Sequence, residues 1–344
     1  MHHWLQAVAA AHAAGARTWT ANGVAVQRVT GGANNALYRL EVDGQRYAAK
    51  LCVADERRRA AREHGALCLL QAAGLDIAPP PIALDESCIL LPFPTVVYRW
   101  LPGEPLGPSP TAPQLVALRD SIQQMHTLPP DDHAAAHLPT AWFHWFDFTP
   151  YLSELHSLLA EYGPWLAANF PDGRDLHTRL GRLVDSCTEV MLTCGVDPGR
   201  DSVLLRLCHV DPNLANAIWG EDDRLRWVDW EYSGWGDPAL ELADLRWHGA
   251  LAGLSEAQHA WLRAGYRRPA GDPGFAARLA VWDRLLATRW PFLVARWLWS
   301  QYRGPDRLRL TPFTSAPAEL YARLVRFIAR AERLADQRCV AYSN

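Results

Sequence analysis

The sequence predicts an α+β fold in two lobes: an N-terminal antiparallel sheet with one helix, and a larger, mostly helical C-terminal lobe. Alternating apolar runs joined by glycine-bearing turns fill the first hundred residues, as in antiparallel strands. Helical patterns dominate from about residue 112 onward. Proline and glycine gather near 100–108, as in a linker. We therefore expect an N-terminal lobe at residues 1–100 and a C-terminal lobe at residues 101–344.

Local signals place the elements of the N-terminal lobe. An alanine-rich helix is expected at 4–16, and a second one at 55–73 with Asp55 as its N-cap and Gly74 just past its end. Asp43-Gly44 between two alternating runs predicts a tight hairpin. Five strands are expected, at 24–29, 37–42, 46–52, 88–91 and 95–100.

The C-terminal lobe has helical patterns at 112–128 and 146–196, the second interrupted at Gly163-Pro164 and at Pro171-Asp172-Gly173. A short β segment is expected at 203–230, and helices from 240 to the end. Trp282, Trp290 and Trp297 recur at near-heptad spacing. This spacing predicts core packing on a helix face, with an aromatic wall for a cationic or ring-shaped substrate as the alternative.

Composition excludes several classes of protein. Of 344 residues, 49% are hydrophobic and 21% charged, as in a globular protein rather than a disordered one. A net charge of −3 predicts no nucleic-acid partner. Seven scattered cysteines without CxxC spacing favour a reducing, cytoplasmic location. No secretory signal or membrane-length apolar run is seen, so we expect no membrane contact. We further expect a monomer or homodimer.

Lysine occurs once, at Lys50, among 34 basic residues. A GC-rich codon bias explains the surplus of arginine, and chance retention of one lysine is the plain alternative. A compact ammonium, however, suits a tight site against a phosphate better than a guanidinium fork does. Lys50 ends a predicted strand that follows the glycine-bearing segment 30–35. The pattern is typical of a nucleotide-phosphate lysine.

The strongest local signal is Cys208-His209-Val210-Asp211-Pro212-Asn213-Leu214-Ala215-Asn216, which contains H-x-D-x-x-x-x-N. A predicted hairpin follows, and Asp229 stands at its exit. Because a hairpin brings its ends together, Asn216 and Asp229 should offer two oxygen ligands suited to Mg²⁺. Asp211 is placed to accept a hydrogen bond from a substrate hydroxyl, and His209 to orient the loop through backbone bonds. Taken singly, these residues could be a loop ion pair, a turn residue and a cap.

With these motifs the sequence resembles the aminoglycoside phosphotransferase and choline kinase superfamily, small-molecule kinases with a protein-kinase-like fold, over about 24–250. The resemblance makes Lys50 the phosphate lysine and Glu63 its helix partner. It places His209, Asp211, Asn216 and Asp229 on catalytic-loop and metal positions, with Val210 where many relatives have glycine. Asp237, in the following Gly-Asp-Pro segment, is expected to brace a turn or cap a helix. The resemblance also implies a phosphate-covering turn with Gly31, Gly32, Asn34 and Asn35, and an adenine-binding hinge at 97–103 with Tyr98 and Trp100.

The resemblance implies an ATP- and Mg²⁺-dependent phosphotransferase acting on a small-molecule hydroxyl, of an antibiotic or of an amino-alcohol or sugar metabolite. A choline- or ethanolamine-type metabolic kinase and a catalytically weak nucleotide-binding module are the alternatives. A protein kinase is disfavoured, because no A-P-E motif follows Asp229. Arginines concentrated in the C-terminal third disfavour a polycationic acceptor.

Overall fold

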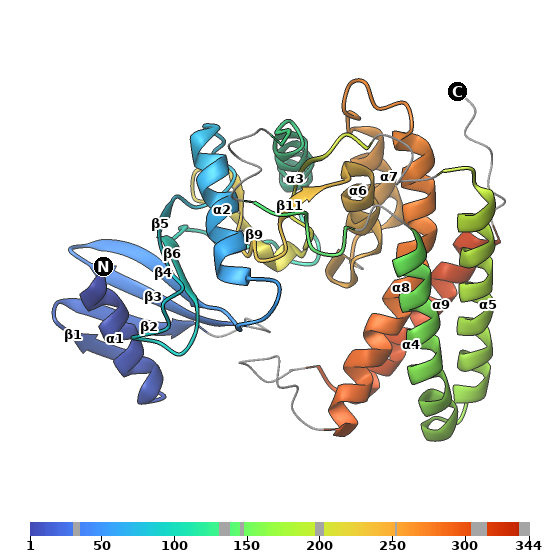
Figure 1. Ribbon diagram of the computed structural model, residues 1–344, viewed down its shortest axis with the longest axis horizontal. Coiled ribbons are helices and arrows are strands. Elements are labelled where there is room, and N and C mark those ends of the chain that lie inside the picture. The colour runs from blue at the N-terminus through green and yellow to red at the C-terminus, as the bar shows by residue number, and fades with distance from the viewer. Residues whose placement is uncertain are drawn as a thin grey trace. The chain divides into compact units, whose positions relative to one another are not determined.

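The structure is a computed structural model that describes residues 1–29, 35–130, 138–144, 148–196, 203–251, 253–303 and 315–336 (Figure 1). The chain divides into two compact units. The first contains the described parts of Met1–Trp142 and Arg206–Trp235. The second contains those of Phe143–Leu205, Gly236–Pro305 and Thr314–Asn344. The mixed α/β fold class is confirmed, whereas the lobe boundary at residue 100 stays a prediction.

The first unit is built on a six-stranded antiparallel sheet with strand order β1-β2-β3-β4-β6-β5. The strand predicted at 88–91 is wrong, since this segment forms bends. The strand beside β6 is instead β5, which begins at Pro81, the last residue of a run of three prolines. Proline is tolerated there because it opens a strand at the sheet edge. The strands are β1 (Thr18–Ala21), β2 (Val24–Val29), β3 (Ala36–Val42), β4 (Gln45–Leu51), β5 (Pro81–Asp85) and β6 (Thr95–Arg99).

Tight turns join the first four strands. Asp43 and Gly44 both have positive φ, 49° and 73°, which confirms the predicted hairpin between β3 and β4. Strand β1 was not predicted, because its four residues are short and largely exposed. Its signal was Asn22-Gly23, which makes the same kind of turn with φ of 50° and 75°.

The two faces of the sheet have different roles. Helix α1 (His2–Ala13) lies over one face, where Leu5 and Val8 share a core with Tyr47, Ala49 and other strand residues. Because side chains alternate along a strand, Lys50 of β4 points to the opposite face. Helix α2 (Arg59–Ala72) packs against β5 and β6 (Figure 1).

Helix α2 begins later than predicted. Its N-cap is Arg58, with a left-handed φ of 48°, so the assignment of Asp55 as N-cap is wrong. The Asp55 carboxylate instead accepts hydrogen bonds from the backbone of Arg57, at 3.1 Å, and from the side chains of Arg57 and Arg59. This local turn competes with a helical start. At the other end the prediction is confirmed, because Gly74 follows the helix with φ of 69°.

The rest of the first unit carries short elements around the predicted catalytic loop. Strands β9 and β10 form the expected hairpin, in which Trp227 pairs with Ala217. The 3-10 helix η1 (Leu214–Asn216) precedes it. The other elements are α3 (Ala112–Met125), β7 (Glu104–Pro105), β8 (Arg206–Cys208), β9 (Ala217–Trp219), β10 (Leu225–Trp227) and β11 (Gly234–Gly236), the last ending at the first residue of the second unit.

The second unit is helical, and α4, α5, α8 and α9 pack against one another (Figure 1). The break predicted at Gly163-Pro164 is wrong, because α4 continues through it. A side chain at position 163 would approach His177 of α5 to 2.4 Å, so this glycine serves close helix packing. The elements are α4 (Phe148–Asn169), α5 (Gly173–Thr193), α6 (Pro238–Trp247), η2 (Gly249–Leu251), α7 (Glu256–Ala264), α8 (Phe275–Arg303) and α9 (Pro317–Ala335).

One prediction for this unit is confirmed, and another is confirmed in part. Trp282 and Trp290 of α8 are 1% and 5% exposed and belong to the core, whereas Trp297 is half-buried. Asp237 caps α6 by accepting from the Ala239 N–H at 2.9 Å, and it also binds Arg278 and the Trp282 indole N–H. The described helices include no segment apolar and long enough to span a bilayer.

Candidate active site

The lysine side chain lies in a cage of carboxylates. The Lys50 ammonium donates to Glu63 Oε2 at 2.5 Å and to Asp229 Oδ1, and lies 3.5 Å from Glu231 Oε2. The Lys50 side chain is only 6% exposed, whereas that of Asp229 is 32% exposed. Lys50 lies on β4, Glu63 lies on α2, and Asp229 and Glu231 follow β10. The fold therefore brings together residues that are far apart in the sequence, such as Lys50 and Asp229, which lie 179 positions apart.

The charges in this cage shift one another's pKa values. Burial lowers the pKa of Lys50, but the carboxylates of Asp229, Glu63 and Glu231 outweigh it and raise that pKa well above its usual value. The ammonium is therefore kept charged. Burial raises the pKa of Glu63 to about 7, although Lys50 acts in the opposite direction. The Glu63 Oε1 atom is buried and has no hydrogen-bond partner within the described residues.

The loop between β8 and η1 is held by its own side chains. His209 is 1% exposed, and its ring bonds the Val228 carbonyl at 2.9 Å and the Asp211 N–H at 3.3 Å. The Asn216 amide donates to Asp211 Oδ2 at 3.0 Å. The Asn216 carbonyl accepts from the Val228 N–H at 2.8 Å, so Asn216 and Asp229 lie at adjacent ends of the hairpin.

Backbone strain marks the same loop and the predicted metal ligand. Val210 has φ of 70° and Asp229 has φ of 66°. Aspartate tolerates this left-handed region, but a β-branched valine rarely adopts it. The conformation explains why glycine suits the position of Val210, and it aims the neighbouring Asp211 side chain.

The predicted nucleotide contacts are placed unevenly. Gly31, Gly32 and Asn34 lie outside the described residues. Asn35 is 7% exposed, and its side-chain amide donates to Glu231 Oε2. Trp100 is half-buried, and its backbone N–H donates to the Arg46 carbonyl at 3.1 Å. Any adenine contact of Trp100 must therefore use other atoms. Tyr98 lies between β4 and β5, and its side chain is buried on the face of Lys50.

Three buried charged residues of the site were not predicted. Glu231 is 0% exposed, Arg59 is 2% exposed, and these two pair at 3.1 Å. Arg62 is 6% exposed and donates only to backbone carbonyls in its described hydrogen bonds, those of Arg57, Thr140 and Ser233. Burial lowers its pKa to about 10. The one available signal was Glu231 itself, an acidic residue between Trp230 and Tyr232, two positions after Asp229.

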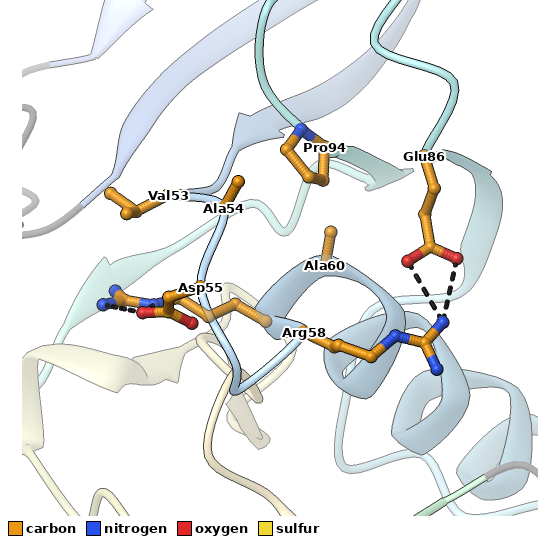
Figure 2. Close-up of a pocket in the computed structure, with 8 residues that line it drawn as sticks. Val53, Ala54, Asp55, Arg58, Ala60, Glu86 and Pro94 are labelled. Carbon is orange, nitrogen blue, oxygen red and sulfur yellow. Dashed lines mark hydrogen bonds and ion pairs between the residues drawn. The ribbon is translucent and has the colours of Figure 1, made fainter.

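A separate cavity of about 250 Å³ lies at the start of α2 (Figure 2). Figure 2 shows Arg58 reaching the Glu86 carboxylate across it, at 3.2 and 3.3 Å. None of the predicted site residues lines this cavity, so we do not place the nucleotide in it. Its lining residues are Val53, Ala54, Asp55, Arg58, Arg59, Ala60, Glu86 and Pro94.

The donor set fits a magnesium nucleotide. Asp229 offers a partly exposed carboxylate, and the Asn216 amide uses its nitrogen toward Asp211, which leaves its oxygen for a hard cation. Three carboxylates gather around the one ammonium, an excess of negative charge that a divalent cation would offset. Lys50 offers the compact ammonium that phosphate oxygens require.

The sheet, the caged lysine and the loop with Asp211 define the class of kinase-like phosphotransferases. A model of the phosphotransferase enzyme family matches residues 25–277, and the chain belongs to this family. No curated protein matches the chain.

Solved structures share the fold. A spectinomycin phosphotransferase in complex with ADP and spectinomycin is 15% identical over 90% of this chain and 93% of its own, with a TM-score of 0.62. An aminoglycoside phosphotransferase in ternary complex with ADP and hygromycin B is 12% identical, with coverages of 91% and 94% and a TM-score of 0.58. A choline/ethanolamine kinase family protein from Mesorhizobium loti is 18% identical, with coverages of 91% and 88% and a TM-score of 0.53.

Proposed function

We propose that this phosphotransferase uses ATP and Mg²⁺ to phosphorylate a hydroxyl group of a small molecule. The observation that carries the proposal is the cage in which Lys50 contacts both Glu63 of α2 and Asp229 after the hairpin. A nucleotide site of this kind needs an ammonium for phosphate oxygens and a carboxylate for the metal in adjoining positions.

Each residue then has a role. Mg-ATP, when bound, supplies the transferable phosphoryl group. Lys50 contacts its phosphate oxygens and is steadied by Glu63, while Asp229 and Asn216 hold the metal. Asp211, whose carboxylate is oriented by Asn216 at 3.0 Å, accepts the hydrogen bond of the acceptor hydroxyl and takes its proton late. His209 fixes the loop and transfers no proton.

The described aromatic residues argue against choline as the acceptor. Tyr232 and Trp142 are the aromatic pair that a quaternary ammonium could use near this loop. The Arg57 guanidinium already lies 5.5 Å from the Tyr232 ring and 5.9 Å from that of Trp142, and it donates to the Tyr232 hydroxyl at 3.0 Å. A second cation would have to displace it.

Three arginines of the C-terminal third give no argument against a cationic antibiotic. Arg263 pairs with Asp283 at 2.5 Å, Arg278 with Asp237, and Arg289 with Glu154 at 2.8 Å. These charges are neutralised within the second unit, so they leave no free basic surface at these positions.

A coupled assay of ADP release in the presence of Mg-ATP tests the proposal. The acceptor panel should include spectinomycin, hygromycin B, choline and simple sugars. We expect acceptor-dependent ADP release with at least one hydroxyl compound. It should fall by about 100-fold or more in Asp211→Ala, because positioning and proton acceptance are both lost. Mg-ADP binding without any acceptor-dependent release across a broad panel would favour the nucleotide-binding module.

A further inference from the structure

Glu231 is the most completely buried carboxylate of the site, and each of its oxygens has a defined partner. Oε1 accepts from Arg59 Nη1 at 3.1 Å. Oε2 accepts from the side-chain amide of Asn35 and lies 3.5 Å from the Lys50 ammonium. The three partners come from α2, from the residue before β3, and from β4. One carboxylate therefore connects three segments of the first unit.

Glu231 and Asp229 stand two positions apart but have different environments. The Asp229 side chain is 32% exposed, whereas that of Glu231 is 1% exposed. Both Glu231 oxygens already accept hydrogen bonds from protein donors. A buried carboxylate so bound is costly to strip of its partners. It is thus built to hold protein groups rather than to enter a metal's coordination shell.

Asn35 is the informative partner. It follows directly on the predicted phosphate turn, and its amide must present nitrogen to Glu231, because an amide oxygen would face a carboxylate oxygen. The contact fixes the residue from which β3 departs, and hence one end of that turn. Lys50 pairs with Leu37 on the next strand, so the same contact also fixes β3 relative to the lysine.

We propose that Glu231 is a positioning residue for phosphoryl transfer. It holds Asn35 and Arg59 in register with Lys50, and so sets the nucleotide geometry without touching the metal or the nucleotide. The inference rests on the proposed function, because it concerns the same nucleotide site. In this proposal Glu231 positions protein groups, whereas Asp229, two residues earlier, binds the metal.

Exchanging donor and acceptor between Asn35 and Glu231 tests this role. In Asn35→Asp two buried carboxylates face each other, so affinity for Mg-ADP should fall by about ten-fold or more. In Asn35→Asp with Glu231→Gln the glutamine amide donates to the new carboxylate, with the hydrogen bond reversed. Mg-ADP affinity should then recover to within about three-fold of that of Glu231→Gln alone. Titration calorimetry gives both values.

One control and two further variants make the outcome decisive. Glu86→Gln removes an exposed carboxylate that pairs with Arg58 at the start of α2, and should leave Mg-ADP affinity unchanged. Glu231→Gln should keep the wild-type Mg²⁺ dependence of ADP binding. Asn35→Ala introduces no buried charge and should also weaken Mg-ADP binding. It replaces Asn35→Asp as the test if that variant does not fold.

The failing results are distinct. A double variant that binds no better than Asn35→Asp alone would overturn the positioning role. So would a normal affinity in Asn35→Ala, or a shifted Mg²⁺ dependence in Glu231→Gln, which would make Glu231 a metal ligand. If the wild-type protein binds no Mg-ADP at all, the proposed function fails and this inference with it.

Discussion

At the scale of the residue, the single lysine has the most specific role. Arginine serves wherever this chain needs a solvated positive charge, as the 34 basic residues with one lysine show. At position 50 the ammonium is 6% exposed and shares its contacts with Glu63 and Asp229. A guanidinium is larger and planar, so it cannot occupy the same three-way contact.

Lys50→Arg should therefore lower kcat/KM for ATP by about 100-fold or more, because the phosphate contact and the Glu63 pair cannot both form. Activity should fall far more than stability, since the positive charge of the cage is kept. Steady-state kinetics beside a thermal melt measure both quantities. Near-normal turnover in this variant would mean that codon bias alone explains the single lysine.

Single-residue signals were also what the sequence could predict of the site. Lys50, Glu63, His209, Asp211, Asn216 and Asp229 stand in recognisable spacings, and the structure brings Lys50, Glu63 and Asp229 into one cage. Glu231, Arg59 and Arg62 were missed because they make contacts with residues remote in the sequence, such as Arg59 with Glu231 and Arg62 with Ser233, which lie 172 and 171 positions apart. No local pattern reports such pairings. Only burial reveals that these charges are interior.

At the scale of the element, the loop that follows β8 is strained to place Asp211. Val210 adopts φ of 70°, which costs about 1–2 kcal/mol for a residue with a side chain at Cβ. Glycine adopts this conformation freely, but it adds about 0.5–1 kcal/mol of chain entropy to the unfolded state. The two effects oppose each other and nearly cancel.

Val210→Gly should consequently leave the free energy of unfolding unchanged within about 1 kcal/mol, or raise it slightly. Val116→Gly, at a helical position of α3, is the matched control and should destabilise by about 0.5–1 kcal/mol. Chemical denaturation measures both variants. A loss in Val210→Gly larger than that of the control would mean that the valine side chain, rather than its backbone, stabilises the loop.

Helix α2 shows why element boundaries are harder to predict than element identity. The sequence pattern predicted the helix and its end at Gly74. The helix begins later than predicted, because the Asp55 carboxylate accepts a hydrogen bond from the Arg57 N–H in a local turn. Arg62 then holds the helix to the carbonyls of Thr140 and Ser233, at 2.8 and 2.6 Å. Strand β5 was not predicted, because it begins with Pro81 and proline is uncommon in strands. Its pairing with β6 at the sheet edge outweighs this preference.

At the scale of the whole molecule, acid stability is set partly by a buried histidine of the second unit. His259 of α7 is 5% exposed, and its Nε2 has no hydrogen-bond partner among the described residues. Burial lowers its pKa to about 4, aided by Arg330 and Arg246 and opposed by Glu256. At this histidine, the native state thus binds fewer protons than the unfolded chain between pH 6.5 and 4.

The contribution of His259 to the free energy of unfolding should therefore fall as pH drops from 6.5 toward 4, by up to about 3 kcal/mol. His259→Gln should show a shallower fall over this window, because the glutamine does not titrate. His156→Gln, at an exposed position of α4, should keep the wild-type profile. Denaturant midpoints of the three proteins at pH 7 and pH 5 measure this fall in stability. Parallel profiles in all three proteins would place the acid sensitivity elsewhere.

The central claim is that the cage around Lys50 is a magnesium-nucleotide site with Asp229 as its metal ligand. Titration calorimetry of ADP at increasing Mg²⁺ tests it most directly, with wild type, Asp229→Asn and Asp211→Ala. Asparagine tolerates the left-handed φ of 66° at position 229, so the exchange removes one charge without straining the backbone.

We expect tight, Mg²⁺-dependent binding in the wild type, and affinity within a few-fold of it in Asp211→Ala. In Asp229→Asn, binding should require a Mg²⁺ concentration at least about ten-fold higher, because a charged ligand is lost. An unchanged Mg²⁺ titration in Asp229→Asn would contradict the account, and so would a collapse of affinity in a folded Asp211→Ala.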